Sequence, residues 1–102
     1  MLQSAAVPLQ LTLVTRRDCH LCEEMAAAIA EVAPSFGAAI ETRDVDADPE
    51  LRARYTNDVP VLLIEGRKAF KYRVSAIELA RRLRAERRRA ALRRWRARLR
   101  RG

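Results

Sequence analysis

The stretch TRRDCHLCEEM, residues 15–25, holds both cysteines of the chain, Cys19 and Cys22, and its only histidine, His20. Apolar and polar residues alternate just before it, over residues 9–14, and this pattern predicts a largely buried strand. From His20 onward the apolar residues recur at helical spacing, which predicts an amphipathic helix. The Cys-X-X-Cys motif is therefore expected where a strand turns into a helix.

The rest of the chain predicts an α/β domain. Residues 38–45 predict a second strand, residues 49–55 a short helix capped by Asp48, and residues 59–72 two strands around a turn. Ser75-Ala-Ile-Glu78 has the spacing of a capping box that opens the last helix. A strand–helix–strand unit makes a parallel pair and a hairpin adds antiparallel strands, so we expect a mixed four-stranded sheet flanked by helices.

Length and composition limit the class of protein. A chain of 102 residues has room for one domain with one core. No apolar run approaches the roughly 20 residues of a membrane span, and residues 1–8 lack the basic start and long apolar stretch of a secretory signal. We therefore expect a cytoplasmic location, where a lasting structural disulfide is unusual.

The positive charge is concentrated at the C-terminal end. Residues 1–74 hold nine Lys+Arg and eleven Asp+Glu, a net charge of −2, whereas residues 75–102 hold twelve Arg and two Glu, a net charge of +10. We expect a domain over residues 8–86 and an Arg-rich helical extension or tail over residues 87–102. Such a tail is suited to contact nucleic acid or an anionic membrane, although a charge run is usually a solvated face.

The apolar residues of the last helix fall into two groups. The first group is expected to cover the sheet and consists of Ala76, Ile77, Leu79, Ala80 and Leu83. The second group consists of Ala91, Leu92, Trp95 and Leu99, and it is rotated around the helix axis relative to the first. This second group predicts either a separate amphipathic segment or a helix extension that projects from the domain.

The position of the cysteines favours redox chemistry. At the start of a helix, Cys19 meets unpaired N–H groups and the positive end of the helix dipole, which favour its thiolate, the nucleophilic form. Cys22 lies one turn deeper and is expected to be shielded, as a resolving thiol would be. His20, when cationic, would stabilise the neighbouring thiolate, whereas Asp18 would oppose it.

Metal binding and inert packing are the alternatives for this motif. A structural zinc site needs four protein ligands, and two Cys and one His do not supply them, so no metal site is expected. Two thiolates alone suit a soft ion such as copper(I). Two unreactive buried cysteines are the remaining interpretation.

Two segments resemble a known family: LTLVTRRDCHLCEEM, residues 11–25, and DVPVLLIEG, residues 58–66. They are similar to the thioredoxin superfamily, and in particular to small glutaredoxin-like proteins with a Cys-His-Leu-Cys motif; the resemblance covers about residues 8–85. It implies a thioredoxin/glutaredoxin-like fold in which the Val59-Pro60 bond is cis and faces the cysteines, whereas the residues alone also allow Pro60 to be an ordinary proline at a strand start.

The same resemblance assigns substrate-binding roles and also shows departures. It implies that the backbone of Val59 pairs with a bound peptide or glutathione, and that Arg16 meets a glutathione carboxylate. Glutaredoxins usually have Pro-Tyr between their cysteines and a Gly-Gly step before the last helix, where this chain has His-Leu and residues 72–75 (Tyr-Arg-Val-Ser). The chain also lacks the Trp-Cys-Gly-Pro-Cys motif of thioredoxins.

These observations predict a thiol–disulfide oxidoreductase that uses Cys19 and Cys22 as a redox-active dithiol. It would need no tightly bound cofactor, would act on a disulfide-containing protein or glutathione, and would take electrons from glutathione or a protein thiol reductase. The alternative is a non-catalytic redox-sensing or metal-holding protein whose Arg-rich tail docks on nucleic acid or an anionic membrane.

Overall fold

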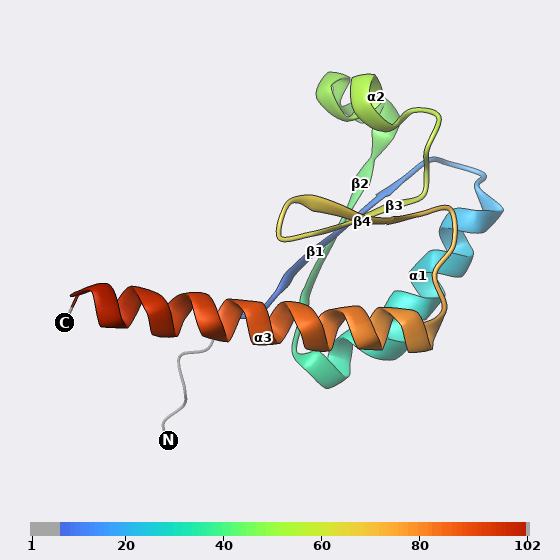
Figure 1. Cartoon of the computed structure of the whole chain (residues 1–102). Helices are drawn as coiled ribbons and strands as arrows, with labels where there is room; N and C mark the ends of the chain where they lie inside the picture. The colour runs from blue at the N-terminus through green and yellow to red at the C-terminus, as the bar shows by residue number, and fades with distance from the viewer. Residues whose placement is uncertain (1–6, 102) are drawn as a thin grey trace.

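The computed structural model describes residues 7–101 and builds them around one four-stranded sheet (Figure 1). The elements follow in the order β1 (Gln10–Thr15), α1 (His20–Val32), η1 (Ala33–Phe36), β2 (Ala39–Asp44), η2 (Val45–Ala47), α2 (Pro49–Tyr55), β3 (Val61–Ile64), β4 (Arg67–Lys71) and α3 (Ala76–Arg101). Most of the N-terminal stretch that lacks a signal pattern, and Gly102 of the expected extension, lie outside the described residues.

The sheet has the strand order β2-β1-β3-β4. The central strand β1 pairs in parallel with β2, with Leu11 opposite Ile40, and antiparallel with β3, with Leu11 opposite Ile64. β3 and β4 form the predicted hairpin, which has an irregular register between Leu62 and Leu63. This is the mixed four-stranded sheet that the sequence predicts.

Helices cover both faces of the sheet. On one face α1 and α3 pack over β1 and β3, and on the other face α2 packs over them (Figure 1). β1 supplies both cores because neighbouring side chains of a strand point to opposite faces: Leu13 enters the first core and Val14 the second. The molecule is thus a three-layer α/β/α structure with a core on each side of the sheet.

The helix α1 begins at the cysteine motif and buries one stripe. Its buried residues are Cys22, Met25, Ile29 and Val32, at successive spacings of three, four and three. The apolar residues Leu21 and Ala28 of the same helix are only half-buried. Cys22 therefore takes part in the packing that fixes α1 on the sheet.

The predicted helix caps are confirmed. The Asp48 carboxylate accepts hydrogen bonds from the N–H groups of Glu50 and Leu51 at the start of α2. At α3, the N–H of Glu78 donates to the Ser75 hydroxyl and the N–H of Ser75 donates to the Glu78 carboxylate, each at 3.0 Å. This reciprocal pair explains where α3 begins.

The last helix, α3, is a single 26-residue element. Leu79 and Leu83 are fully buried against the sheet, but Ile77 is 70% exposed, so the expectation that it covers the sheet is wrong. Ile77 and Leu79 are two residues apart and therefore point to nearly opposite sides of the helix. The outer half of α3 extends past the sheet (Figure 1), and the molecule measures 50 × 28 × 22 Å.

α3 runs without a break through residue 87, so both apolar groups of the C-terminal stretch lie on one helix. Within residues 7–101, no helix has the length and apolar character needed to cross a membrane.

Candidate active site

Cys19 and Cys22 are joined by a disulfide at the N-terminus of α1, with their Cα atoms 5.2 Å apart. Cys19 is the N-cap residue and has extended backbone angles, φ −115° and ψ 105°. Its Sγ accepts a hydrogen bond from the N–H of Cys22 at 3.1 Å. The sulfur thus occupies the place where a capping oxygen usually satisfies a free helix N–H, and the same N–H is available to a Cys19 thiolate after reduction.

The two sulfur atoms differ in their access to solvent. Cys22 is 4% exposed, as expected for a shielded partner, whereas Cys19 is partly exposed. A hollow of about 220 Å³ opens beside the disulfide, and its lining residues are Leu13, Thr15, Arg16, Asp18, Cys19, Cys22, Glu23, Ala26 and Thr42. A molecule that reaches the pair from this side meets Cys19 first.

The hollow continues into an apolar groove between α1 and the edge strand β2. A second hollow of about 150 Å³ shares Leu13, Ala26 and Thr42 with the first and is also lined by Ile29, Ala30 and Ile40. Ile40 is 48% exposed although it faces this groove. The disulfide therefore lies at one end of a largely apolar channel along the sheet edge.

Arg16 anchors the loop that leads from β1 to Cys19. Its guanidinium donates to both carboxylate oxygens of Asp46, and to the carbonyl and hydroxyl oxygens of Thr56. At least four of its five N–H groups are thus used within the chain. This placement ties the cysteine loop to η2 and to the end of α2, and the expected contact of Arg16 with glutathione stays a prediction.

The Arg16–Asp46 pair shifts both groups towards their charged forms. The hydrogen bond from Arg16 lowers the pKa of Asp46 from its ordinary value, and the charges of Arg16 and Arg52 act in the same direction. The hydrogen bond to Asp46 likewise raises the pKa of Arg16. Both groups are charged at neutral pH, so this contact between the cysteine loop and η2 is ionic.

His20 lies on the exposed side of α1, next to two carboxylates. Its side chain is 82% exposed, with Nε2 at 3.0 Å from the Glu24 carboxylate and Nδ1 at 3.9 Å from that of Glu23. Arg73, in the segment before α3, pairs with the same Glu24 at 3.3 Å. The imidazole is thus held by Glu24 on the first turn of the helix rather than buried beside the sulfur atoms.

Val59 and Pro60 lie directly before β3, and the bond between them is cis, as the resemblance implies. Pro60 is buried, and Val59 packs against the core on the α2 side of the sheet. The carbonyl of Pro60 accepts a hydrogen bond from the N–H of Tyr72 at 2.8 Å. The loop that carries the cis-proline is therefore fixed from the end of β4.

Tyr72 is a contact residue of this loop that the sequence did not indicate. It has a positive φ of 70°, a conformation that favours glycine. Its hydroxyl donates to the carbonyl of Asn57 at 3.2 Å and lies 3.4 Å from the Asp58 carboxylate. The side chain thus bridges the end of β4 and the loop before Pro60. The one signal for Tyr72 in the sequence is its position, where glutaredoxins usually have a Gly-Gly step.

Within residues 7–101, no group of three or more His, Cys, Asp or Glu side chains is placed to hold a metal ion. The sulfur atoms at the candidate site are those of the cysteine pair itself.

The strand order, the cysteine pair that starts α1 and the cis-proline before β3 together define a protein of the thioredoxin superfamily. Within that class, the chain belongs to the family described as "Glutaredoxin-like domain (DUF836)", which matches residues 10–84. The family match thus includes the cysteine motif, the cis-proline and the first part of α3.

Solved structures show the same fold. Protein XcR50 from X. campestris is 34% identical, with a TM-score of 0.62, and the match covers 74% of this chain and 96% of that one. Protein Ne2328 from Nitrosomonas europaea is 26% identical, with a TM-score of 0.65, and 76% and 94% of the two chains are covered. Thioredoxin 1 from Thermosipho africanus, at 19% identity, 81% and 96% coverage and a TM-score of 0.53, shows likeness of fold alone.

Curated relatives are mycobacterial. "Uncharacterized protein Rv0508" of Mycobacterium tuberculosis and "Uncharacterized protein Mb0520" of Mycobacterium bovis are each 36% identical over 64 residues, which is 58% of this chain. The match spans 66% of the length of these relatives.

Proposed function

We propose that this protein is a thiol–disulfide oxidoreductase in which Cys19 is the nucleophile and Cys22 the resolving thiol. The observation that supports this most is the asymmetry of the pair: Cys19 is the partly exposed N-cap of α1, and Cys22 is 4% exposed one turn later. A structural disulfide would need no such difference between its sulfur atoms. A dithiol exchange reaction needs one sulfur that reaches the substrate and one that waits behind it.

The reaction begins with the reduced protein. The Cys19 thiolate attacks one sulfur of a substrate disulfide, so that a Cys19–substrate bond forms, the substrate S–S bond breaks and the second substrate sulfur leaves as a thiolate. Cys22 loses its proton to solvent and attacks the Cys19 sulfur. The Cys19–Cys22 bond forms, the mixed disulfide breaks, the first substrate sulfur leaves as a thiolate, and two electrons have passed from the protein dithiol to the substrate.

Residues around the pair are assigned supporting roles. The N–H of Cys22, 3.1 Å from the Cys19 sulfur, would stabilise the thiolate, and a cationic His20 would add to this. The backbone of Val59, beside the cis-proline, is assigned to pair with the substrate chain. Because Arg16 is already bound to Asp46 and Thr56, we assign it to positioning the cysteine loop.

The cycle closes when an external thiol reduces the Cys19–Cys22 bond. Glutathione and a protein thiol reductase both have the required chemistry, and neither has to be a tightly bound cofactor. We place the reaction in the cytoplasm, where thiol pools keep such pairs reduced. A disulfide-containing protein is the substrate class that an open hollow beside Cys19 accommodates.

The test uses the small aromatic disulfide 5,5′-dithiobis(2-nitrobenzoate) and the reduced protein. The Cys22→Ser variant is expected to release one thionitrobenzoate per chain and to keep the other as a mixed disulfide on Cys19. The unchanged protein is expected to release two and to end as the unmodified internal disulfide, which mass spectrometry distinguishes from a doubly modified chain.

Cys19→Ser is the matched control, because it leaves only the shielded thiol. It is expected to react at least about tenfold more slowly than Cys22→Ser. Equal rates for the two variants, or a doubly modified product from the unchanged protein, would contradict the assigned roles of nucleophile and resolving thiol.

A further inference from the structure

The outer part of α3 carries an apolar stripe that the domain does not cover. Leu92, Trp95 and Leu99 are 43%, 54% and 60% exposed. At 100° per residue these three side chains fall within an arc of about 60° on the helix. Three large apolar side chains on one exposed face are more than the scattered single residues that a protein surface normally shows.

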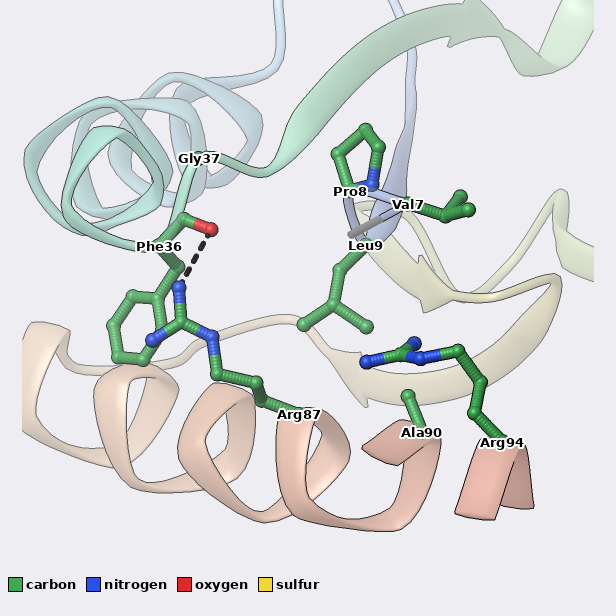
Figure 2. A pocket seen from close by; sticks show the side chains of 8 residues that line it. All are labelled: Val7, Pro8, Leu9, Phe36, Gly37, Arg87, Ala90 and Arg94. Carbon is green, nitrogen blue, oxygen red and sulfur yellow. Dashed lines mark hydrogen bonds between the residues drawn. The ribbon is translucent and has the colours of Figure 1, made fainter. Parts of the chain in front are cut away.

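The direction of this stripe is fixed by contacts on the opposite side of the helix. Arg87 donates to the carbonyl of Phe36 at 3.0 Å, and its guanidinium lies over the Phe36 ring, 5.0 Å from the centroid. Figure 2 shows Arg87, Ala90 and Arg94 on the side of α3 that faces Leu9 and Phe36. Ala90 lies about half a turn from the stripe, so the stripe faces away from the body.

Positive charge surrounds the stripe. Residues 87–102 contain no acidic residue. They contain nine arginines: Arg87, Arg88, Arg89, Arg93, Arg94, Arg96, Arg98, Arg100 and Arg101. Arg96 lies about 40° from Leu92 on one side of the stripe, and Arg98 about 60° from Trp95 on the other. An apolar stripe with tryptophan, bordered by arginines, has the pattern of a helix that lies in a lipid–water interface.

We propose that residues 87–101 bind an anionic lipid surface, with Leu92, Trp95 and Leu99 among the acyl chains and the bordering arginines at the headgroups. The charge of the segment is complementary to such a surface, and its apolar stripe needs an apolar environment. Nucleic acid would satisfy the arginines but would leave the stripe in water. A second copy of this chain would cover the stripe but would bring two strongly basic segments together.

The docking end and the thiol end of the molecule are far apart. In Figure 1, the start of α1, where Cys19 lies, is at the opposite side of the molecule from the C-terminus. Lipid binding by the outer helix therefore leaves the cysteine pair accessible. Lipid binding by the outer helix and thiol exchange at the cysteine pair can therefore be measured independently.

Trp95 is the only tryptophan of the chain, so its fluorescence reports directly on the stripe. The experiment mixes the full-length protein with vesicles of phosphatidylcholine alone, or of equal parts phosphatidylcholine and phosphatidylglycerol. Co-sedimentation and a blue shift of the Trp95 emission are expected with the anionic vesicles only, because the indole moves from water to the interface.

Two kinds of variant separate lipid insertion from simple charge attraction. The double variant Leu92→Ser with Leu99→Ser keeps every arginine and is expected to bind anionic vesicles at least about tenfold more weakly, because two apolar side chains no longer leave water. Val7→Ser is the control: this residue is apolar and 70% exposed, but it lies beside Ala90, on the side of α3 opposite to the stripe, and its replacement is expected to leave binding unchanged.

Any of the following results would overturn the proposal of lipid binding. No binding to the anionic vesicles overturns it directly. Binding without a blue shift that the double leucine variant retains indicates a general polyanion contact, and tighter binding to a DNA duplex than to the vesicles identifies nucleic acid. A Trp95 emission that is already shifted without lipid, and returns to that of exposed tryptophan on dilution, identifies a second copy as the occupant.

Discussion

Arg16 donates two hydrogen bonds to Asp46, from Nε to Oδ2 at 2.9 Å and from Nη2 to Oδ1 at 3.2 Å. The two residues are 30 positions apart, and the pair connects the loop before Cys19 with η2. Planar two-point contacts of this kind restrict orientation as well as distance. The position of the nucleophile we propose therefore depends in part on a charge located outside the motif.

This pair predicts a pH-dependent contribution to stability. The pKa of Asp46 is lowered in the folded protein by the hydrogen bond from Arg16, so the contribution is present above the ordinary aspartate pKa of about 3.9 and is lost as the pH falls through the folded value. Asp46→Asn is expected to lower the urea midpoint at neutral pH, with a difference that narrows in acid. The exposed change Glu41→Gln serves as control, and a difference that does not vary with pH would show that the charge of Asp46 is irrelevant.

Tyr72 predicts different stabilities for two truncated variants. Both Tyr72→Ala and Tyr72→Gly remove the hydroxyl contact with Asn57, but only glycine adopts the positive φ of 70° without steric cost. The glycine variant is expected to be about 1 kcal/mol more stable than the alanine variant in chemical unfolding. An alanine variant as stable as the glycine variant would mean that the backbone changes conformation once the ring is removed.

Glu86 predicts a stabilising substitution within α3. Its carboxylate is 3% exposed; Oε2 pairs with Arg82 at 2.9 Å and with Arg89 at 3.6 Å, while Oε1 has no hydrogen-bond partner within residues 7–101. Replacing a buried, incompletely paired carboxylate with an apolar side chain of similar size removes its desolvation cost. Glu86→Met is therefore expected to maintain or raise the thermal midpoint, because Arg82 and Arg89 both reach solvent.

Substitution of the other member of the ion pair, Arg82, provides the control. Arg82→Met leaves the Glu86 carboxylate buried with its weaker partner alone, and a loss of about 1–3 kcal/mol is expected. If Glu86→Met were the more damaging of the two, the ion pair would be a net contributor to stability.

Glu23 predicts an electrostatic effect on the reactivity of Cys19. It lies four residues after Cys19, on the same side of α1, and lines the same hollow. In the Cys22→Ser background, Glu23→Gln is expected to speed alkylation of Cys19 by iodoacetamide about twofold at neutral pH and low salt, because a nearby negative charge disfavours the thiolate.

Two comparisons test the origin of that effect. Glu31→Gln, at the far end of the same helix, is expected to leave the alkylation rate unchanged, and molar salt is expected to abolish the effect of Glu23→Gln. A faster rate that persists at high salt would indicate a change in access to the sulfur rather than in charge.

The sequence predicted the elements whose pattern is set by burial. Residues 9–14 alternate because successive side chains of β1 enter different cores, and the caps at Asp48 and Ser75 follow from local hydrogen bonding. The prediction for Ile77 is wrong because this residue lies about 160° around the helix axis from the buried Leu79. Helical spacing, rather than composition, decides which residues of α3 reach the sheet.

The candidate site was only partly predictable. The cysteine pair follows from a short motif and the cis-proline from the family resemblance, but the side-chain partners of Arg16 and Tyr72 lie 14 to 40 positions away in the chain. Such pairings depend on how the layers pack, and the positive φ of Tyr72 depends on the turn that β4 makes. Motifs and periodicity in a single sequence do not show these contacts between distant segments.

Because α3 is one unbroken helix, the buried Leu79 and the outer Trp95 belong to the same rigid rod. With a rise of 1.5 Å per residue, the tryptophan lies about 24 Å along the axis from the leucine. A surface that binds the outer half of α3 is therefore held in a fixed position relative to the sheet. If that surface is a lipid bilayer, α3 lies along it, and the sheet, which packs on the opposite side of α3, stays in the water phase together with the thiols.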